Sequence, residues 1–237
     1  MNNIRLHYVE SIVENSTSLV SREHSHYIVN VMRLKKGSNI NFFNKEGEWL
    51  SEIISIERDK VEVKFLNKVK EPLKISNIEL AICLVKKTPL EIILQKATEL
   101  GVSKITPIIS ERTEIKELNL ERANKITVEA TEQSNQLNPP VLNQVISLKD
   151  FISNINQDTK LFFADVNSNY KIKSGDAGKG QSISILVGPE GDFSPQEREL
   201  ILASPNLTSF TLSRNILRTD TAVISAISLV NFIRADH

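Results

Sequence analysis

The sequence contains a single cysteine, no excess of charge of either sign and few aromatic residues. Cys83 alone can form neither an internal disulfide nor a thiolate metal cluster. The 29 Lys+Arg residues balance the 29 Asp+Glu residues, which excludes a polybasic tail protein and a strongly acidic, solvating segment. This balance does not exclude a nucleic-acid partner, because binding depends on where the charges lie.

Long hydrophobic runs are also missing. The longest apolar stretch, residues 222–233, is interrupted by polar side chains and is shorter than the roughly 20 residues of a membrane span. The start of the chain has no basic segment followed by an apolar run, so we expect no secretory signal. His24 and His26 are two apart on a predicted helix and do not share a face, so no zinc site is expected. We therefore predict a soluble, cytoplasmic protein without a metal or a membrane segment.

What is present is an ordinary globular composition, with 40% hydrophobic and 24% charged residues in 237. Up to residue 70, short runs of high β-propensity are separated by turn signals, which indicates a small β-rich unit. One helix, Arg22–Arg33, interrupts it, and we expect its apolar stripe to be buried. The residues of that stripe are Tyr27, Ile28, Val31 and Met32.

From Ile78 onward, short apolar strands alternate with amphipathic helices, the pattern of βαβ units in a parallel sheet. The predicted strands are Ile78–Val85, Lys104–Ile109, Thr159–Ala164, Ile183–Val187 and Ser209–Leu212.

The ends of the predicted helices carry recognisable signals. Thr88 and Ser194 are each followed by proline and, three residues on, by glutamate, which predicts a capping box at each position. Gly101 stands where a left-handed C-cap favours glycine. The last helix, Thr219–Ile233, is apolar on most sides, so we expect it to be buried in its domain or against another subunit.

Residues 187–193 lead from a predicted buried strand into a capped helix. Gly188 and Gly191 allow a sharp turn and a close approach of a ligand to the backbone, and the helix N-terminus offers free amides. A strand-to-helix turn that needs glycine only for its geometry is an equally good explanation. The spacing matches neither a P-loop nor a dinucleotide fingerprint.

A second strand end, residues 212–222, also runs into a helix. Thr219 or Asp220 is expected at the N-cap of that helix. Arg218 lies just before it, and its guanidinium needs a partner, for which an anionic or polarisable substrate is one option.

Five segments in this order resemble the RsmE-type family of bacterial 16S ribosomal RNA (uracil-N3)-methyltransferases, which belong to the SPOUT class. These segments are His26–Leu34, Lys96–Val102 with Pro107 after it, Glu132–Ser134, Leu186–Ser194 and Ile216–Ala222. The resemblance implies a PUA-like β-barrel RNA-binding domain in residues 1–71 and a trefoil-knotted α/β methyltransferase domain in residues 72–237. It also implies a homodimer whose knot helices pack together.

The resemblance further implies that S-adenosyl-L-methionine is bound, bent, among three loops and is contacted largely by main-chain groups. The residues matched to these loops are Phe163, Ala164, Gly188, Pro189, Glu190, Gly191, Leu212, Ser213, Ile216, Leu217 and Thr221. The reaction would be transfer of a methyl group to N3 of a uridine in 16S ribosomal RNA, within the small ribosomal subunit. Arg218 and Asp220 are the expected catalytic residues, with Glu190 as another possible proton acceptor.

The candidate RNA contacts are basic side chains, for each of which a solvated surface cation is an equally good explanation. They are Arg22, His26, Arg33, Lys35, Lys36 and Lys86.

The chain departs from the family pattern at several of these positions. The family usually has Gly-Arg where Asn135-Gln136 stands, glycine at Ser213, often arginine at Asn215, and glutamate at Asp220. Two alternatives therefore stay open. The chain could be an RNA-binding or ribosome-assembly factor that has lost turnover, or, if the glycine turn binds phosphates, an enzyme acting on a small nucleotide.

Overall fold

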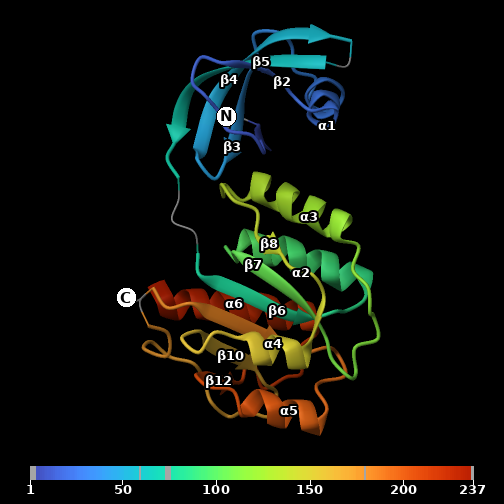
Figure 1. Cartoon of the computed structure of the whole chain (residues 1–237), viewed down its shortest axis with the longest axis vertical. Coiled ribbons are helices and arrows are strands. Elements are labelled where there is room, and N and C mark those ends of the chain that lie inside the picture. The colour runs from blue at the N-terminus through green and yellow to red at the C-terminus, as the bar shows by residue number, and fades with distance from the viewer. Residues whose placement is uncertain (1–3, 59, 73–75, 179, 236–237) are drawn as a thin grey trace. The chain divides into compact units, whose positions relative to one another are not determined.

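The computed structural model describes residues 4–58, 60–72, 76–178 and 180–235, and it divides into two compact units (Figure 1). The first unit comprises Met1–Lys74 and Thr131–Asn138, and the second comprises Ile75–Ala130 and Pro139–His237. The segment Thr131–Asn138 therefore belongs to the β-rich unit, although it lies far along the chain within the range predicted for the second domain.

The first unit is built on a five-stranded sheet of order β1-β3-β4-β5-β2. Strand β1 pairs in parallel with β3, whereas the β3–β4, β4–β5 and β5–β2 pairs are antiparallel. This confirms the predicted small β-rich unit. The strands are β1 (Arg5–His7), β2 (Thr17–Leu19), β3 (Asn39–Asn44), β4 (Gly47–Glu57) and β5 (Lys60–Lys70).

The core of this unit comes from alternate residues of its strands. Ile40 and Phe42 on β3 and Val61, Val63 and Phe65 on β5 are buried, because successive side chains of a strand point to opposite faces. Removing such apolar surface from water stabilises the unit by about 25 cal/mol per Å².

The predicted helix begins at Arg22 but changes type part-way. Helix α1 (Arg22–His26) continues as the π-helix η1 (Tyr27–Val31), in which the Met32 amide bonds the Tyr27 carbonyl. The wider turn rotates the later side chains away from the core. Ile28 is buried, whereas Val31 and Met32 are exposed, so the prediction that both belong to the buried stripe was wrong.

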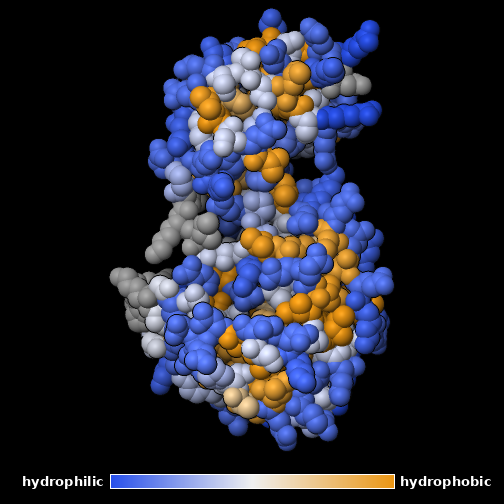
Figure 2. All heavy atoms as spheres, viewed as in Figure 1, coloured by the Kyte–Doolittle hydropathy of each residue, from blue (hydrophilic) through white to orange (hydrophobic). Residues whose placement is uncertain are grey.

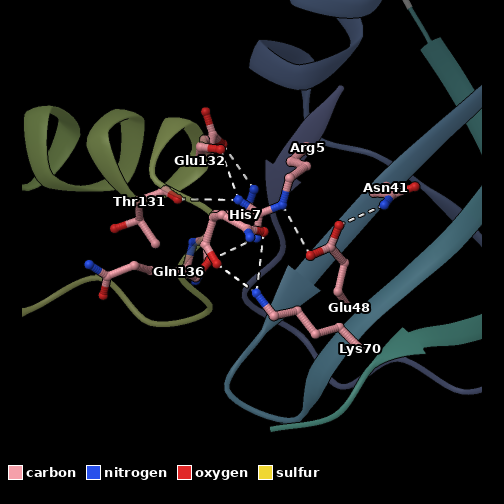
Figure 3. A network of polar contacts seen from close by, with 9 residues as sticks. Arg5, His7, Asn41, Glu48, Lys70, Thr131, Glu132 and Gln136 are labelled. Atoms are coloured by element: carbon pink, nitrogen blue, oxygen red, sulfur yellow. Dashed lines mark hydrogen bonds and ion pairs between the residues drawn. The ribbon is translucent and has the colours of Figure 1, made fainter. Parts of the chain in front are cut away.

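A polar network fastens Thr131–Asn138 to the sheet of the first unit (Figure 3). Arg5 on β1 forms a 3.0 Å ion pair with Glu48 on β4, and its guanidinium also donates to the carbonyls of Glu132, at 2.9 Å, and Gln136, at 2.8 Å. The His7 amide donates to the Glu132 carboxylate. The Arg5 side chain is only 12% exposed and the Glu48 side chain 5% exposed. Removing such charges from water is costly, so the fold requires hydrogen bonds to their remaining donors and acceptors.

The second unit is built on a seven-stranded parallel sheet of order β12-β10-β11-β6-β7-β8, with β9 also paired to β7. Its strands are β6 (Ile78–Cys83), β7 (Lys104–Ile109), β8 (Val141–Leu142), β9 (Ile146–Ser147), β10 (Lys160–Ala164), β11 (Ile183–Val187) and β12 (Leu207–Phe210). Its helices are α2 (Lys87–Glu99), α3 (Leu120–Gln133, which ends in the first unit), α4 (Leu148–Asn154), α5 (Pro195–Leu202) and α6 (Thr219–Ala235). The predicted βαβ organisation is confirmed.

The two faces of this sheet have separate cores. On β6, Ile78, Leu80 and Ile82 join the core that includes α2 and α6, whereas Ala81 and Cys83 join the core that includes α4 and α5. The alternation follows from the period of two in a strand. The unit is therefore a three-layer α/β/α arrangement, typical of parallel sheets with both faces covered.

The helix ends agree with the sequence signals at some positions only. Ser194 forms the predicted capping box with Glu197, and Gly101 follows α2 with φ +83°. At Thr88 the prediction was wrong, because α2 already begins at Lys87 and its N-cap residue, Lys86, makes no side-chain cap bond. Likewise, α6 begins at Thr219, so Thr219 and Asp220 lie in its first turn instead of capping it.

The surface is mixed in character. Hydrophilic residues cover most of the face shown in Figure 2, and apolar residues gather over the region of α2. Within the described ranges, no helix is both long and apolar enough to cross a membrane.

Candidate functional site

The three predicted loops, which follow β10, β11 and β12, leave the sheet of the second unit at the same edge. Ala164, the last residue of β10, pairs with Val187 at the end of β11 and with Phe210 at the end of β12. All three strands are parallel, so their carboxyl ends lie at the same edge. Ligands of open α/β sheets bind at this edge, where the loops can surround them.

A pocket of about 680 Å³ opens between two of these loops. Its walls are formed by residues 166–172, after β10, and residues 211–214, after β12, with Leu229 of α6 completing the lining. The volume is in the range of about 300–1,000 Å³ that is usual for small-molecule sites. Val166, Ile172 and Leu212 supply apolar surface, and hydroxyl and amide groups supply polar contacts.

Of the predicted cofactor-binding residues, Leu212 and Ser213 line this pocket. Phe163 is buried in the core with its ring 5.7 Å from the Phe193 ring, so its side chain is not available to a ligand. Ile216 is 91% exposed. Among the remaining members of the set, Pro189 is buried, Ala164 and Leu217 are partly buried, and Thr221 is exposed.

The glycine turn after β11 has a packing explanation of its own. A Cβ at Gly188 would lie 2.9 Å from the Phe193 ring, which is too close for any side chain. The Gly191 carbonyl accepts a 2.9 Å hydrogen bond from Arg112, and Pro189 is buried while Glu190 is exposed. Packing against the Phe193 ring therefore accounts for glycine at 188, and ligand contact is not needed to explain it.

Asp165, directly before the pocket-lining residues 166–172, is the centre of a hydrogen-bonded cluster. Its carboxylate accepts hydrogen bonds from Arg198 (2.6 Å), the Ser209 hydroxyl (2.9 Å) and the Asn167 amide (2.9 Å). Burial alone would raise the pKa of Asp165, but these hydrogen bonds and the charge of Arg198 outweigh burial and lower it. Asp165 thus joins the start of one pocket wall to β12 and α5.

The predicted catalytic residues lie at the start of α6. Arg218 is exposed and, within the part of the chain that the structure describes, its side chain makes no recorded hydrogen bond or ion pair. Its carbonyl accepts from the Ala222 amide. The Asp220 carboxylate accepts a 2.8 Å bond from the Thr221 amide and is partly buried.

Several pocket residues were missed by sequence reasoning. They are Val166, Ser168, Asn169, Lys171, Ile172, Thr211, Arg214 and Leu229. The loop after β10 was identified as a cofactor loop, but nothing in its composition indicated which side chains face inward.

The candidate RNA contacts fall in both units. Arg22, His26, Arg33, Lys35 and Lys36 belong to the first unit and are all exposed, and Val31 and Met32, from the same segment, are exposed apolar side chains. Lys86 belongs to the second unit and lies 3.9 Å from Glu114. Within the described ranges, no group of three or more His, Cys, Asp or Glu side chains could hold a metal ion.

One departure from the family pattern is explained by local geometry. Asn135 has φ +60°, a conformation that glycine adopts freely and that asparagine tolerates better than most residues. Lys70 donates to the Asn135 carbonyl at 2.7 Å. The neighbouring Gln136 accepts a hydrogen bond from the Arg5 guanidinium on its main-chain carbonyl, a contact that does not depend on the side chain and does not explain glutamine at this position.

Cys83 is fully buried, and burial raises the pKa of its thiol to about 12. We therefore expect the folded protein not to react with a thiol reagent such as dithionitrobenzoate at pH 8, because only the thiolate reacts. Measurement of the absorbance of the released thiolate checks this, with the urea-unfolded protein as the control that gives one equivalent per chain. Rapid labelling of the folded protein would contradict the burial of this residue.

Comparisons with known proteins agree with this architecture. A family model described as an RNA methyltransferase domain matches residues 71–231, and one described as an RNA methyltransferase PUA domain matches residues 20–66. The ribosomal RNA small subunit methyltransferase E of Rickettsia conorii is 34% identical over 97% of this chain and 95% of its own length. The enzyme of that name from Bacillus subtilis is 31% identical over 94% of this chain and 93% of its own length.

A solved structure of the ribosomal RNA small subunit methyltransferase E from Neisseria gonorrhoeae, bound to S-adenosyl methionine, matches with a TM-score of 0.88. The two chains are 26% identical, with 98% of each covered. The predicted fold class, a SPOUT trefoil-knot domain preceded by a PUA-like domain, is confirmed by these matches. The chain belongs to the ribosomal RNA small subunit methyltransferase E family.

Proposed function

We propose that this chain is an S-adenosylmethionine-dependent methyltransferase that methylates N3 of a specific uridine in 16S ribosomal RNA. The observation that carries the proposal is the pocket at the carboxyl edge of the parallel sheet, between two of the three loops expected to hold the cofactor. The names of the relatives, ribosomal RNA small subunit methyltransferases, support the reaction. The proposed site of action is the small ribosomal subunit, in the cytoplasm.

The pocket lining fits such a cofactor. Apolar side chains, among them Val166, Ile172 and Leu212, offer surface for a purine ring, and Ser168, Asn169, Thr211 and Ser213 offer hydrogen-bonding groups. When bound, the cofactor supplies a methyl group on a positively charged sulfur. The chain's main task is then alignment, which can contribute about 7–11 kcal/mol to lowering the barrier.

Arg218 and Asp220 have separate parts in the proposed reaction. As the bond from uracil N3 to the methyl carbon forms and the carbon–sulfur bond breaks, the N3 proton leaves. Arg218 donates to the uracil oxygens, on which negative charge develops when the proton departs. The proton passes to solvent or to a carboxylate, either Asp220 or Glu190.

N3 lies on the Watson–Crick edge of uracil, so the target base must be unpaired or extruded. The exposed cations of the first unit, Arg22, Arg33, Lys35 and Lys36, are proposed to hold the surrounding RNA by its phosphates, with His26 and Lys86 as further contacts. If glutamine at these four cations left the salt dependence of RNA affinity unchanged, that assignment would fail.

A homodimer is part of the proposal. Phe232, on α6, is 65% exposed, and Leu229 on the same helix is exposed as well. Large apolar side chains exposed together on one helix are typical of a surface that a partner covers. Light scattering that gave the mass of a single chain at micromolar concentration would exclude this arrangement.

Cofactor binding distinguishes the proposed methyltransferase from the rival function, a non-catalytic RNA-binding factor. Isothermal calorimetry is expected to detect S-adenosylmethionine at one site per chain, since the pocket is formed by a single unit. The variant Leu212→Lys removes apolar surface and adds a positive charge to the pocket wall, so it should weaken binding of the cofactor, whose net charge is positive. RNA binding without any cofactor binding would favour the rival.

A further inference from the structure

The charges that line the pocket are all of one sign. Lys171 comes from the wall after β10 and Arg214 from the wall after β12, and the lining contains no carboxylate among the described residues. Both cations are exposed, and their side chains make no recorded hydrogen bond or ion pair within the described ranges. By contrast, Arg198, whose partner Asp165 directly precedes the pocket-lining residues 166–172, is held in an ion pair.

The cofactor does not account for this charge. S-adenosylmethionine carries a sulfonium and an ammonium against one carboxylate, so its net charge is positive and a purely cationic lining does not attract it. The other reactant is RNA, which carries one negative phosphate per nucleotide. Cations without intramolecular partners at the edge of a hollow are well suited to an anionic backbone.

The position of the two cations adds a geometric argument. A uridine methylated at N3 must leave its stack and bring its Watson–Crick edge to the cofactor at the pocket, while the phosphates on its two sides stay outside. Lys171 and Arg214 lie on the two facing loops, one on each wall. An arginine can hold a phosphate through two parallel hydrogen bonds, whereas a lysine acts as a point charge.

We propose that Lys171 and Arg214 bind the phosphates that flank the target uridine, one from each wall of the pocket. The proposal rests on the proposed methyltransferase function and extends its RNA contacts to the second unit. Neither residue is a candidate catalytic group, so their effect is on RNA binding and not on the chemical step.

The test uses the full-length variants Lys171→Gln, Arg214→Gln and the double variant. Affinity for small ribosomal subunits lacking the modification is measured at several salt concentrations, and cofactor affinity is measured by calorimetry. Each substitution is expected to weaken RNA binding and to reduce the slope of log K against log salt by about 0.7–0.9, one phosphate contact. Cofactor affinity should not fall, because removing a cation from the lining takes no attraction away from a ligand whose net charge is positive. Lys149→Gln, at an exposed lysine of α4 outside the pocket lining, is the matched control.

Two results would overturn the proposal. One is an RNA affinity and salt slope equal to those of the wild type. The other is a loss of cofactor affinity with RNA affinity intact, which would place the cations on the cofactor carboxylate. Failure of the methyltransferase function itself would be seen separately, as a wild-type protein that transfers no methyl group whatever the salt slope of its variants.

Discussion

Replacing Arg218 by alanine is expected to lower kcat by about 10²–10³-fold, the usual effect of removing one donor that stabilises a developing negative charge. Affinity for S-adenosylmethionine should change little, because Arg218 does not line the pocket. The fold should be preserved as well, since the Arg218 side chain is exposed and has no recorded partner among the described residues. Single-turnover methyl transfer with saturating cofactor and RNA measures this effect.

Two further variants make the Arg218 result specific. Arg234→Ala removes an arginine at the opposite end of α6 and should leave kcat unchanged. Arg218→Lys keeps the charge but loses the planar fork of donors, so it should recover only part of the rate. Full turnover in Arg218→Ala, with normal cofactor binding, would show that another group stabilises the charge.

Substitution of Arg5 by methionine is expected to destabilise the first unit by about 3–5 kcal/mol, because it leaves the buried Glu48 carboxylate without its ion-pair partner. The carbonyls of Glu132 and Gln136 lose their donor at the same time. The one tryptophan of the chain, Trp49, is buried in this unit, so its fluorescence in a urea titration reports on the first unit selectively.

Two control variants distinguish the effect of losing the Arg5–Glu48 ion pair from the effect of changing the side chain at position 5. Arg22→Met, at an exposed arginine of the same unit, should shift stability by no more than about 0.5 kcal/mol. Combining Arg5→Met with Glu48→Leu should restore much of the loss, because a buried pair replaced by apolar groups is often neutral. A single variant as stable as the wild type would mean that the network of Figure 3 contributes little.

Strong periodic signals made much of the second unit predictable. The bounds predicted for β7 and β11 coincide with the structure, because short β-branched runs between turn signals leave few alternatives. The predictions of helix geometry were wrong where the chain adopts a local structure other than the one that the sequence pattern favours. The helix becomes a π-helix at Tyr27–Val31, and Val31 and Met32 are exposed instead of buried. Helix α2 begins at Lys87, one residue before Thr88, its expected N-cap.

The candidate site was predictable at the level of loops. Parallel strands place their carboxyl ends at one edge, so the loops after β10, β11 and β12 could be grouped from the sequence. Their individual side chains could not be assigned, since orientation there depends on tertiary contacts such as the Asp165–Arg198 pair. The bond from Arg5 to Gln136 joins positions 131 residues apart, and no periodicity indicates such a pairing.

The central claim is methyl transfer to N3 of a uridine in 16S ribosomal RNA, and identification of the labelled nucleoside tests it most directly. The purified protein is incubated with methyl-labelled S-adenosylmethionine and small ribosomal subunits from a strain lacking the gene, and the RNA is digested to nucleosides. The account predicts label in 3-methyluridine at one site per subunit. Label in a different nucleoside, or no label while the cofactor is bound, would contradict it.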